Sequence, residues 1–485
     1  MNILVAHSNS LRMDPKQLRK MQPYPPLGTL YAAAALRKEG WNVSLFDATF
    51  TSSHDDFRKI LSAVTPDVFV ICEDVFNFIS KMCLSEMRLE ALGMLADARD
   101  RGCKTIAAGP DMSAHPDTYL RNGADYVVRG EPDRTLVELC RSLEHTDTSA
   151  IRSLPGIAFL AADGSIQCAS DREPESDLSL LAPPAWDLID IDRYRAAWTS
   201  VHGRFSLIVA ASRGCPFHCR WCAKPIWGRH HAVRAPEDVV DEMSVLKSRY
   251  APDHLWFADD NFGYPIDWLE RFTGHVNRRS VKIPFTIQTR VDLLSEPAIR
   301  CLASAGCREV WIGAESGNQG ILDAMNKGIR VEAVAPAVEN LRTAGIRSGL
   351  FIQFGYPGET LDEIRDTIRM IRLARPDDIG ISVCYPLPGA ELYPSARKHL
   401  GHKTNWRHSD DLDMLFQGAY DTPFYRKLHE VLHLEMDLIR ESAGVFPAIS
   451  DHRRDTLFKL TDAWFELGRL ERISRTSQTT DFDDD

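Results

Sequence analysis

The sequence lacks a long hydrophobic run, an excess of basic residues and a leading segment of signal type. No stretch approaches the ~20 consecutive apolar residues of a membrane-spanning helix, so we expect no membrane span. A formal net charge of −11 argues against a nucleic-acid partner. The first seven residues enter strand-like sequence without a basic region or cleavage site, which predicts a cytoplasmic protein. With 485 residues, 44% of them hydrophobic, the chain is typical of a globular protein with several domains.

Cysteine is sparse outside one short segment. Eleven cysteines are present, and three of them, Cys215, Cys219 and Cys222, fall within eight residues. Without an export signal, this cluster indicates a metal or redox role rather than disulfides. We interpret the other eight as small buried hydrophobic residues: Cys72, Cys83, Cys103, Cys140, Cys168, Cys301, Cys307 and Cys384.

The first 145 residues alternate strand and helix patterns, which predicts an α/β domain with a doubly wound parallel sheet. Ligands of such sheets bind beyond the carboxyl ends of the strands. No Gly-x-Gly-x-x-Gly follows the first strand, which weakens a dinucleotide-binding interpretation. The expected strands are 3–7, 43–46, 67–72, 104–108 and 126–128; the expected helices are 28–38 and 80–101. The segments expected at the carboxyl ends are 8–27, 73–78, 109–115 and 129–131.

Three further regions follow. Residues 146–203 are rich in turn residues and predict a linker with a small hairpin at 156–168. Residues 204–400 resume the alternation and predict a full or partial βα barrel with chemistry at the carboxyl ends of its strands. Residues 401–485 predict a helical region, with a helix at 424–441 and a disordered acidic tail at 481–485. The expected barrel strands are 205–211, 254–258, 285–289, 309–313, 348–354 and 380–384; the clearest barrel helices are 236–250 and 361–375.

The three clustered cysteines directly follow the first barrel strand. Three thiolates can hold an iron–sulfur cube, which normally takes four cysteines, and would leave one iron open for a small ligand. A structural zinc ion would need a fourth donor, for which His218, His230 or His231 are near in sequence. The spacing and the position after a strand favour the open iron–sulfur cluster.

Cys-x3-Cys-x2-Cys after the first barrel strand, with Trp221 before the last cysteine, resembles the radical S-adenosylmethionine (SAM) superfamily. The resemblance implies a 4Fe–4S cluster held by Cys215, Cys219 and Cys222. It also implies that SAM binds the open iron and is cleaved to a 5′-deoxyadenosyl radical.

The ends of the later barrel strands resemble the family's SAM-binding segments. Taken singly, Glu315 could cap a helix, Arg290 could be a surface ion-pair partner, and Gly-Tyr-Pro-Gly could be a tight turn. Five matches in order favour a SAM site. The resemblance implies these contacts to SAM: Asp259 and Asp260 near the amine, Arg290 near the carboxylate with Gln288 on the same side of the strand end, Glu315 and Ser316 near ribose and carboxylate, and Phe354 and Gly355 near adenine.

The N-terminal domain resembles the cobalamin-binding domain that precedes many radical SAM barrels, through residues 25–31, 109–115 and 128–131. The resemblance implies a cobalamin in contact with Gly109 and Pro110. The Asp-x-His-x-x-Gly motif is absent, and His7 and His115 are not in its frame, so we expect no histidine of that motif on cobalt. The alternative is a Rossmann-like domain that binds a nucleotide or nothing.

Together the two halves resemble cobalamin-dependent radical SAM enzymes. That implies methylation of an unactivated carbon, less often phosphorus, in a small organic or natural-product intermediate. The alternative is oxidation, cyclisation or rearrangement without methyl transfer; a sensor would have no use for an open iron. We expect a monomer, a small-molecule substrate and an external electron donor such as flavodoxin or ferredoxin. Trp406 and Tyr420 could pack on the substrate, although we favour interdomain core for both.

Overall fold

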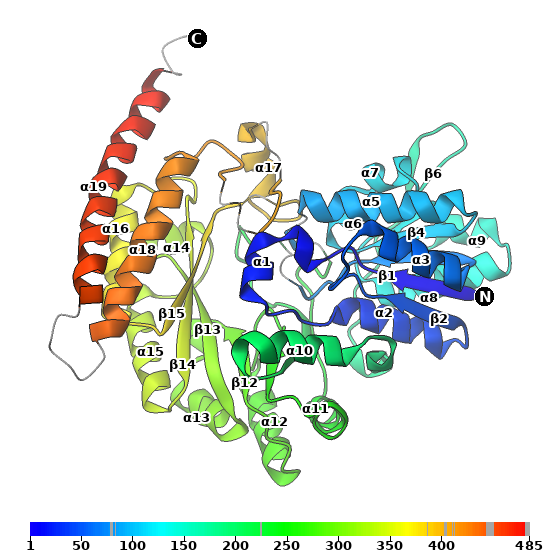
Figure 1. Cartoon of the computed structure of the whole chain (residues 1–485), viewed down its shortest axis with the longest axis horizontal. Coiled ribbons are helices and arrows are strands. Elements are labelled where there is room, and N and C mark those ends of the chain that lie inside the picture. Colours follow the sequence, from blue (N-terminus) through cyan, green and yellow to red (C-terminus); the bar gives the residue numbers. More distant parts are fainter. Residues whose placement is uncertain are drawn as a thin grey trace.

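The computed structural model of the chain describes residues 1–77, 81–82, 84–223, 226–385, 387–401, 405–409, 411, 413–442 and 451–480. Two α/β halves lie side by side, and two long helices flank the second half (Figure 1). Some sequence predictions fall outside the described residues: Phe78, the helix start at Ser80, Cys83 and the acidic tail 481–485.

The first half contains a seven-stranded sheet in the order β2-β1-β3-β4-β5-β6-β7. All pairs from β2 to β5 are parallel, which confirms the predicted doubly wound parallel sheet. Its strands are β1 (Asn2–Ala6), β2 (Asn42–Phe46), β3 (Val68–Cys72), β4 (Lys104–Ala108), β5 (Tyr126–Val128), β6 (Ile157–Leu160) and β7 (Ile166–Cys168). The helices of this half are α1 (Pro15–Lys20), α2 (Leu27–Lys38), α3 (His54–Val64), α5 (Ser85–Asp100), α6 (Pro110–Ala114), α7 (Pro116–Arg121), α8 (Pro132–Glu144) and α9 (Thr148–Ser153).

The strand order reverses at β1, which lies between β2 and β3. In open α/β sheets the ligand crevice forms at this reversal, beyond the carboxyl ends of the strands. His7 and Ser8 follow β1, and Glu73 and Asp74 follow β3. All four are buried, so the crevice of this sheet is lined by polar side chains.

The predicted hairpin is confirmed as β6 and β7, with the Ser165 N–H donating to Asp163 Oδ1 at 2.9 Å in the turn. It pairs antiparallel with β5, so the N-terminal sheet continues beyond residue 145 and the hairpin is not a separate part of a linker. Cys168 ends edge strand β7 and is exposed; its predicted burial was wrong. Cys301 is only partly buried, whereas five of the other scattered cysteines are buried as predicted: Cys72, Cys103, Cys140, Cys307 and Cys384.

The second half is a sheet of six parallel strands in the order β15-β14-β13-β12-β11-β8. In the described part of the chain the edge strands β8 and β15 do not pair with each other, so the structure is a partial barrel. Its strands are β8 (Ser206–Val209), β11 (His254–Phe257), β12 (Phe285–Thr289), β13 (Cys307–Glu315), β14 (Arg347–Phe354) and β15 (Asp378–Val383). Its helices are α11 (Pro236–Tyr250), α12 (Ile266–Arg278), α13 (Glu296–Ala305), α14 (Gln319–Ala324), α15 (Val334–Thr343) and α16 (Leu361–Ala374).

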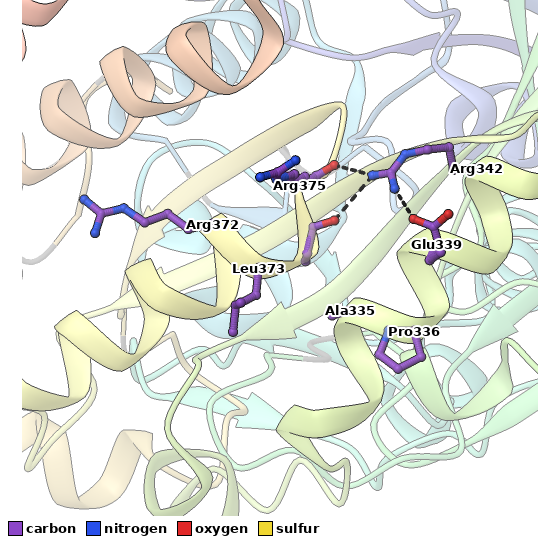
Figure 2. A pocket seen from close by; sticks show the side chains of 8 residues that line it. Ala335, Pro336, Glu339, Arg342, Arg372, Leu373 and Arg375 are labelled. Atoms are coloured by element: carbon purple, nitrogen blue, oxygen red, sulfur yellow. Dashed lines mark hydrogen bonds and ion pairs between the residues drawn. The ribbon is translucent and has the colours of Figure 1, made fainter. Parts of the chain in front are cut away.

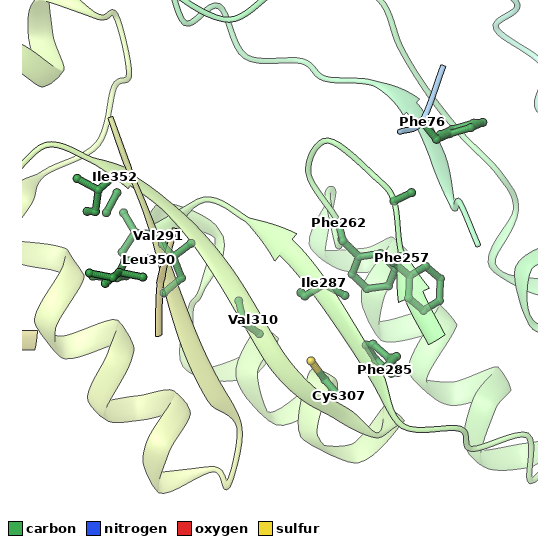
Figure 3. Packing of buried hydrophobic residues seen from close by; sticks show 14 of the residues in the cluster. Phe76, Phe257, Phe262, Phe285, Ile287, Val291, Cys307, Val310, Leu350 and Ile352 are labelled. Carbon is green, nitrogen blue, oxygen red and sulfur yellow. The ribbon is translucent and has the colours of Figure 1, made fainter. Parts of the chain in front are cut away.

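One apolar core spans both halves. Alternate residues of the barrel strands, such as Ile287, Val310 and Leu350, are buried beneath the barrel helices (Figure 3). The same cluster includes Tyr31 and Phe76 of the N-terminal half. Burial of apolar surface stabilises by about 25 cal/mol per Å², so a shared core holds the two sheets in one orientation.

The linker region before the barrel and the C-terminal helices also pack against this core. In α10 (Ile191–His202), Trp198 Nε1 donates to the Pro23 carbonyl at 2.7 Å. The helices α18 (Thr422–Ser442) and α19 (Asp451–Thr480) pack on each other beside the barrel (Figure 1). Trp406 and Tyr420 are both 3% exposed, which confirms that they are core residues. No helix in the described ranges has the length and apolar content to cross a membrane.

Candidate active site at the barrel mouth

The cysteines lie on a loop held by a short antiparallel pair, β9 (Ser212–Gly214) and β10 (His231–Val233). Ser212 Oγ donates to Asp259 Oδ1 at 2.5 Å, which ties the pair to the end of β11. Gly214 has φ +74°, and a Cβ there would fall 2.1 Å from the His230 carbonyl oxygen. Only glycine fits this close approach, so the base of the loop is fixed by the residue before Cys215.

Cys215, Cys219 and Cys222 are all partly exposed on this loop. Within the described ranges, no three His, Cys, Asp or Glu side chains, these cysteines included, are grouped to hold a single metal ion. Of the histidines that could complete a zinc site, His230 Nε2 lies 3.1 Å from the Glu175 carbonyl. Three thiols on one loop fit a 4Fe–4S cluster with one iron not bound by the protein.

Arg290 comes from the end of β12 and lies against the cysteine loop. Its Nη1 is 3.9 Å from Cys219 Sγ, and its guanidinium lies 3.8 Å from the centre of the Phe217 ring. Asp292 accepts from Nε at 2.9 Å and from Nη2 at 3.0 Å. A fixed cation beside Cys219 is suited to attract a carboxylate group. That Arg290 binds the carboxylate of SAM stays a prediction.

Glu315 ends β13 at an irregularity in the strand and has φ +61°. A positive φ is uncommon for a residue with a side chain, and such strain is typical of functional sites. Its Oε1 accepts from Lys327 Nζ at 2.8 Å, and both residues are buried. Burial opposes the charge on Lys327, but Glu315 and Cys219 outweigh it and raise its pKa. The sequence interpretation missed Lys327, whose only signal was its position 12 residues after Glu315.

Asp259 and Asp260, predicted near the SAM amine, already have protein partners. Asp259 accepts from Ser212 and from the Ala211 N–H at 3.1 Å, and burial raises its pKa to about 6. Asp260 accepts from Lys81 Nζ at 2.7 Å. Gln288 Nε2 donates to the Asp259 carbonyl at 2.8 Å. The three residues therefore support the loop base and the interface between the halves.

Ser316, Phe354 and Gly355 lie at the neighbouring strand ends. Ser316 Oγ lies 3.3 Å from Thr367 Oγ1 on α16, and Phe354 is part of the core. The Gly355 N–H donates to Glu359 Oε2 at 2.6 Å and closes the turn after β14. Burial raises the pKa of Glu359 to about 8. The contacts of Ser316, Phe354 and Gly355 to ribose and adenine stay predictions. Gly355 has no side chain, so it would contact SAM through its backbone in the turn after β14.

The crevice of the N-terminal sheet contains buried polar atoms without partners. Ser8 Oγ and Glu73 Oε2 make no hydrogen bond within the described structure. Gly109 has φ +137°, and a Cβ there would lie 2.7 Å from Glu73 Cβ, so this glycine lets β4 approach β3. Pro110 follows as the first residue of α6. A ligand with amide side chains, such as cobalamin, fits these unpartnered atoms, since buried polar groups are normally hydrogen-bonded.

Neither histidine considered for cobalt is in the expected frame. His7 Nε2 lies 3.0 Å from Asp47 Oδ1 and 3.1 Å from the Ala48 nitrogen. Burial lowers the pKa of His115, which lies on the loop between α6 and α7. His7 directly follows β1 at the carboxyl ends of the strands and is 2% exposed.

A buried ionic cluster joins the two sites. Arg213, in β9, pairs with Glu131 and lies 2.7 Å from Asp133, beyond the carboxyl end of β5. Trp227 Nε1, on the cysteine loop, donates to Glu131 at 3.2 Å. The Arg213 guanidinium also lies 5.1 Å from the centre of the Tyr31 ring. The sequence interpretation noted the segment of Glu131 but gave Arg213 no role, because its partners lie about 80 residues earlier.

A surface hollow on the outer wall of the barrel is unrelated to these strand ends. Arg342 of α15 donates to the carbonyls of Ala374, at 3.4 Å, and Arg375, at 2.7 Å, and pairs with Glu339 (Figure 2). The arginine thus satisfies the carbonyls that end α16. This is a structural contact between helices.

Comparisons with known proteins match both halves. The model of the radical SAM superfamily matches residues 209–371, and that of the B12 binding domain matches residues 21–140. An uncharacterized methyltransferase of Pyrococcus horikoshii is 26% identical over 406 residues, which are 82% of this chain and 84% of that protein. An anaerobic magnesium-protoporphyrin IX monomethyl ester cyclase of Rubrivivax gelatinosus is 26% identical over 377 residues. These are 76% of this chain and 66% of that protein, so the match spans just under two thirds of the cyclase.

Two solved structures share the fold. The radical SAM methyltransferase TsrM from Kitasatospora setae, with a tryptophan substrate and a SAM analog bound, has a TM-score of 0.67 and 19% identity, covering 82% of this chain and 76% of its own. The cobalamin-dependent radical SAM enzyme OxsB, with aqua-cobalamin and SAM bound, has a TM-score of 0.64 and 18% identity. The match covers 81% of this chain and 55% of the OxsB chain. The chain thus carries a region that matches the B12 binding domain, followed by one that matches the radical SAM superfamily, and in this arrangement it is similar to cobalamin-dependent radical SAM enzymes.

Proposed function

We propose that this chain is a cobalamin-dependent radical SAM methyltransferase that methylates an unactivated carbon of a small organic or natural-product intermediate. The observation that carries the proposal is the buried contact between Arg213, next to the cysteine loop, and Glu131 and Asp133, beyond the carboxyl end of β5 in the N-terminal sheet. Methyl transfer by this chemistry needs both cofactors near one substrate carbon. The buried ion pairs of Arg213 hold the cysteine loop against the N-terminal half, which supports this proposal.

The residues suited to hold the cofactors come from the strand ends of both halves. Cys215, Cys219 and Cys222 would hold the cluster. Arg290 would orient the SAM carboxylate, and Glu315, held in place by Lys327, would accept from SAM hydroxyl or amine groups. Held by these residues, cobalamin would supply a methyl carrier, and the cluster would supply the electron for reductive cleavage of SAM.

The SAM region is built to keep its charges in fixed positions. Lys327 is 6% exposed and Glu315 5% exposed, so their pairing is little screened by solvent. Residues Gly109 and Pro110 would contact cobalamin at the opposite side of the mouth, next to the unpartnered atoms of Ser8 and Glu73.

The names of several relatives support methyl transfer. They include a cytidylyl-2-hydroxyethylphosphonate methyltransferase of Streptomyces wedmorensis and a hopanoid C-2 methylase of Rhodopseudomonas palustris, each 24% identical to this chain. The magnesium-protoporphyrin ester cyclases among the relatives favour the second candidate, radical oxidation or cyclisation without methyl transfer. We propose methyl transfer as the main activity and a monomeric cytoplasmic enzyme as its setting.

Methyl-deuterated SAM separates the two candidates. The enzyme with cobalamin, reductant and a candidate substrate should give a product that carries the labelled methyl group, with one S-adenosylhomocysteine and one 5′-deoxyadenosine per product. A product without label, formed with 5′-deoxyadenosine alone, would reject methyl transfer and support oxidation or cyclisation. Size-exclusion chromatography with light scattering tests the monomer.

A further inference from the structure

The barrel strands carry two aromatic side chains on the face of the sheet that points away from the helices. Val310 and Leu350 point to the barrel helices, so Trp311 and Phe351, one residue further along each strand, point to the inner face (Figure 3). The two rings stack with their centroids 4.9 Å apart and an interplanar angle of 26°. Both side chains are partly exposed, and neither belongs to an apolar core cluster of the described residues. We call Trp311 and Phe351 the aromatic platform.

Two glycines let these rings lie flat on the sheet. Gly349 pairs with Trp311 in the strand register, and Gly380 pairs with Phe351. A Cβ at Gly349 would fall 2.5 Å from Trp311 Cδ2, and one at Gly380 would fall 3.1 Å from Phe351 Cδ1. Neither glycine has a positive φ, so both provide space and not an unusual backbone. Glycine within a strand often marks a place where a ligand approaches closely.

The aromatic platform continues into the predicted SAM site. Gly313 follows Trp311 by two residues on the same face of β13, about 6.6 Å further along the strand. The Glu315–Lys327 pair lies over Gly313, where a Cβ would fall 2.6 Å from Lys327 Nζ and 2.8 Å from Glu315 Oε1. A molecule stacked on the platform would therefore lie next to this pair, deeper in the partial barrel.

An unpartnered amide lies beside the platform. Gln353 follows Phe351 by two residues on β14 and points to the same face of the sheet. It is 1% exposed, and neither Oε1 nor Nε2 makes a hydrogen bond within the described structure. A buried amide without partners costs stability, so this side chain is suited to a ligand that both donates and accepts.

We propose that the aromatic platform and Gln353 bind the substrate, and that the substrate carries a planar aromatic ring with a carboxamide-like group beside it. The proposal rests on the proposed function, because it names the substrate class of the same site. Aromatic rings stack favourably on one another, and a carboxamide matches both the donor and the acceptor of the Gln353 amide. A saturated lipid chain would gain no stacking and would leave the amide unpartnered.

Binding can be measured without turnover. The probe is benzamide and its saturated counterpart is cyclohexanecarboxamide, each titrated with the whole protein by saturation-transfer NMR. Benzamide should bind about fivefold more tightly, because only its ring stacks on the platform. Equal affinity for the two amides, or no benzamide binding up to about 20 mM, overturns the aromatic substrate class.

Trp311→Leu tests the platform. This variant should bind benzamide about fivefold more weakly, and Phe351→Leu provides the same test should Trp311→Leu fail to fold. The matched control is Trp464→Leu, which replaces another partly exposed tryptophan, on α19 outside the barrel. Its benzamide affinity should equal that of the unchanged protein. Equal affinities of the platform variant and the control overturn the platform as a binding surface.

Gln353→Met separates a ligand-binding amide from a structural one. Without ligand it should melt no lower than the unchanged protein, because no hydrogen bond is lost. Gln288→Met should melt lower, since Gln288 Nε2 donates to the Asp259 carbonyl at 2.8 Å. Gln353→Met should also bind benzamide about fivefold more weakly and SAM with unchanged affinity. A melting temperature as low as that of Gln288→Met, or a loss of affinity for SAM and not for benzamide, overturns the role of Gln353.

The binding results are independent of methyl transfer. If the platform variants lose benzamide as expected but no labelled methyl group reaches a product, the methyltransferase assignment is rejected and the platform stands. If the label is transferred but Trp311→Leu and Trp464→Leu bind benzamide equally, the platform is rejected and the methyltransferase assignment stands.

Discussion

Removal of the Arg213 charge tests how the two halves are held together. Arg213→Met keeps an apolar chain of similar reach but leaves Glu131 and Asp133 without their cation. The three side chains are between 3% and 10% exposed, so solvent replaces little of the lost pairing. Loss of one partner from a buried ion pair typically costs about 3–5 kcal/mol, and the contact to Tyr31 is lost as well. We expect a destabilisation at the upper part of this range.

Calorimetry of the protein without cofactors measures this cost, with hydrogen exchange at residues 212–214 and 226–233 to locate it. The control is Arg58→Met on α3, because Arg58 also bonds two carboxylates, Asp55 and Asp97, but at the surface. Exposed pairs contribute little, so the control should unfold close to the unchanged protein.

The reasoning would be refuted if Arg213→Met unfolded within ~1 °C of Arg58→Met at pH 8. A double-mutant cycle with Glu131→Gln measures the coupling directly and should give an interaction energy well above the ~0.5 kcal/mol of independent sites.

Three more predictions concern the site. Replacement of Cys215, Cys219 and Cys222 by Ala should remove the ~400 nm absorption after anaerobic reconstitution, and a full complement of iron and sulfide in that variant would reject the ligand assignment. Glu315→Ala should abolish 5′-deoxyadenosine formation but keep the cluster spectrum, whereas Cys301→Ala should change neither; unchanged cleavage in Glu315→Ala would move the SAM site elsewhere. Burial raises the pKa of Glu359 from 4.5 to about 8, so its neutral form stabilises the fold fully below pH 4.5, and this stabilisation is lost as the pH rises through about 8. The melting temperature of Glu359→Gln relative to the unchanged protein should therefore rise from about pH 5 to about pH 9, and a constant difference would contradict a buried neutral Glu359.

Local patterns were sufficient to predict the strands and the cysteine loop. The six barrel strands were predicted to within about two residues at most ends, because parallel strands buried on both faces read as continuous apolar runs. The cysteines could be assigned to one site since all three lie on one loop. The hairpin at 156–168 was predicted from its Asp-Gly turn, but its pairing with β5 was not, because edge pairing depends on a strand some 30 residues earlier.

The interactions that organise the site were less predictable because they join distant segments. Lys327 and Glu315 pair across 12 residues, and Arg213 and Glu131 across 82. Asp259 and Asp260 end a strand as expected of ligand-binding residues, yet their carboxylates bind Ser212 and Lys81. A sequence shows that a charged residue ends a strand, but the tertiary fold decides which neighbour it meets.

The proposed function requires two cofactor domains to act on one carbon, and the shared core provides a fixed arrangement for this. Tyr31 and Phe76 of the first sheet pack in the same cluster as the barrel residues, and Lys81 reaches across to Asp260 at 2.7 Å. Arg213 adds a charged contact within three residues of the first cysteine. A radical and a methyl donor have to approach one atom from different cofactors, and a misplacement of about 1 Å can cost 100-fold in rate. Domains joined by a free linker could not hold that geometry, whereas a continuous apolar core clamped by buried charges keeps the carboxyl ends of both sheets at a fixed separation.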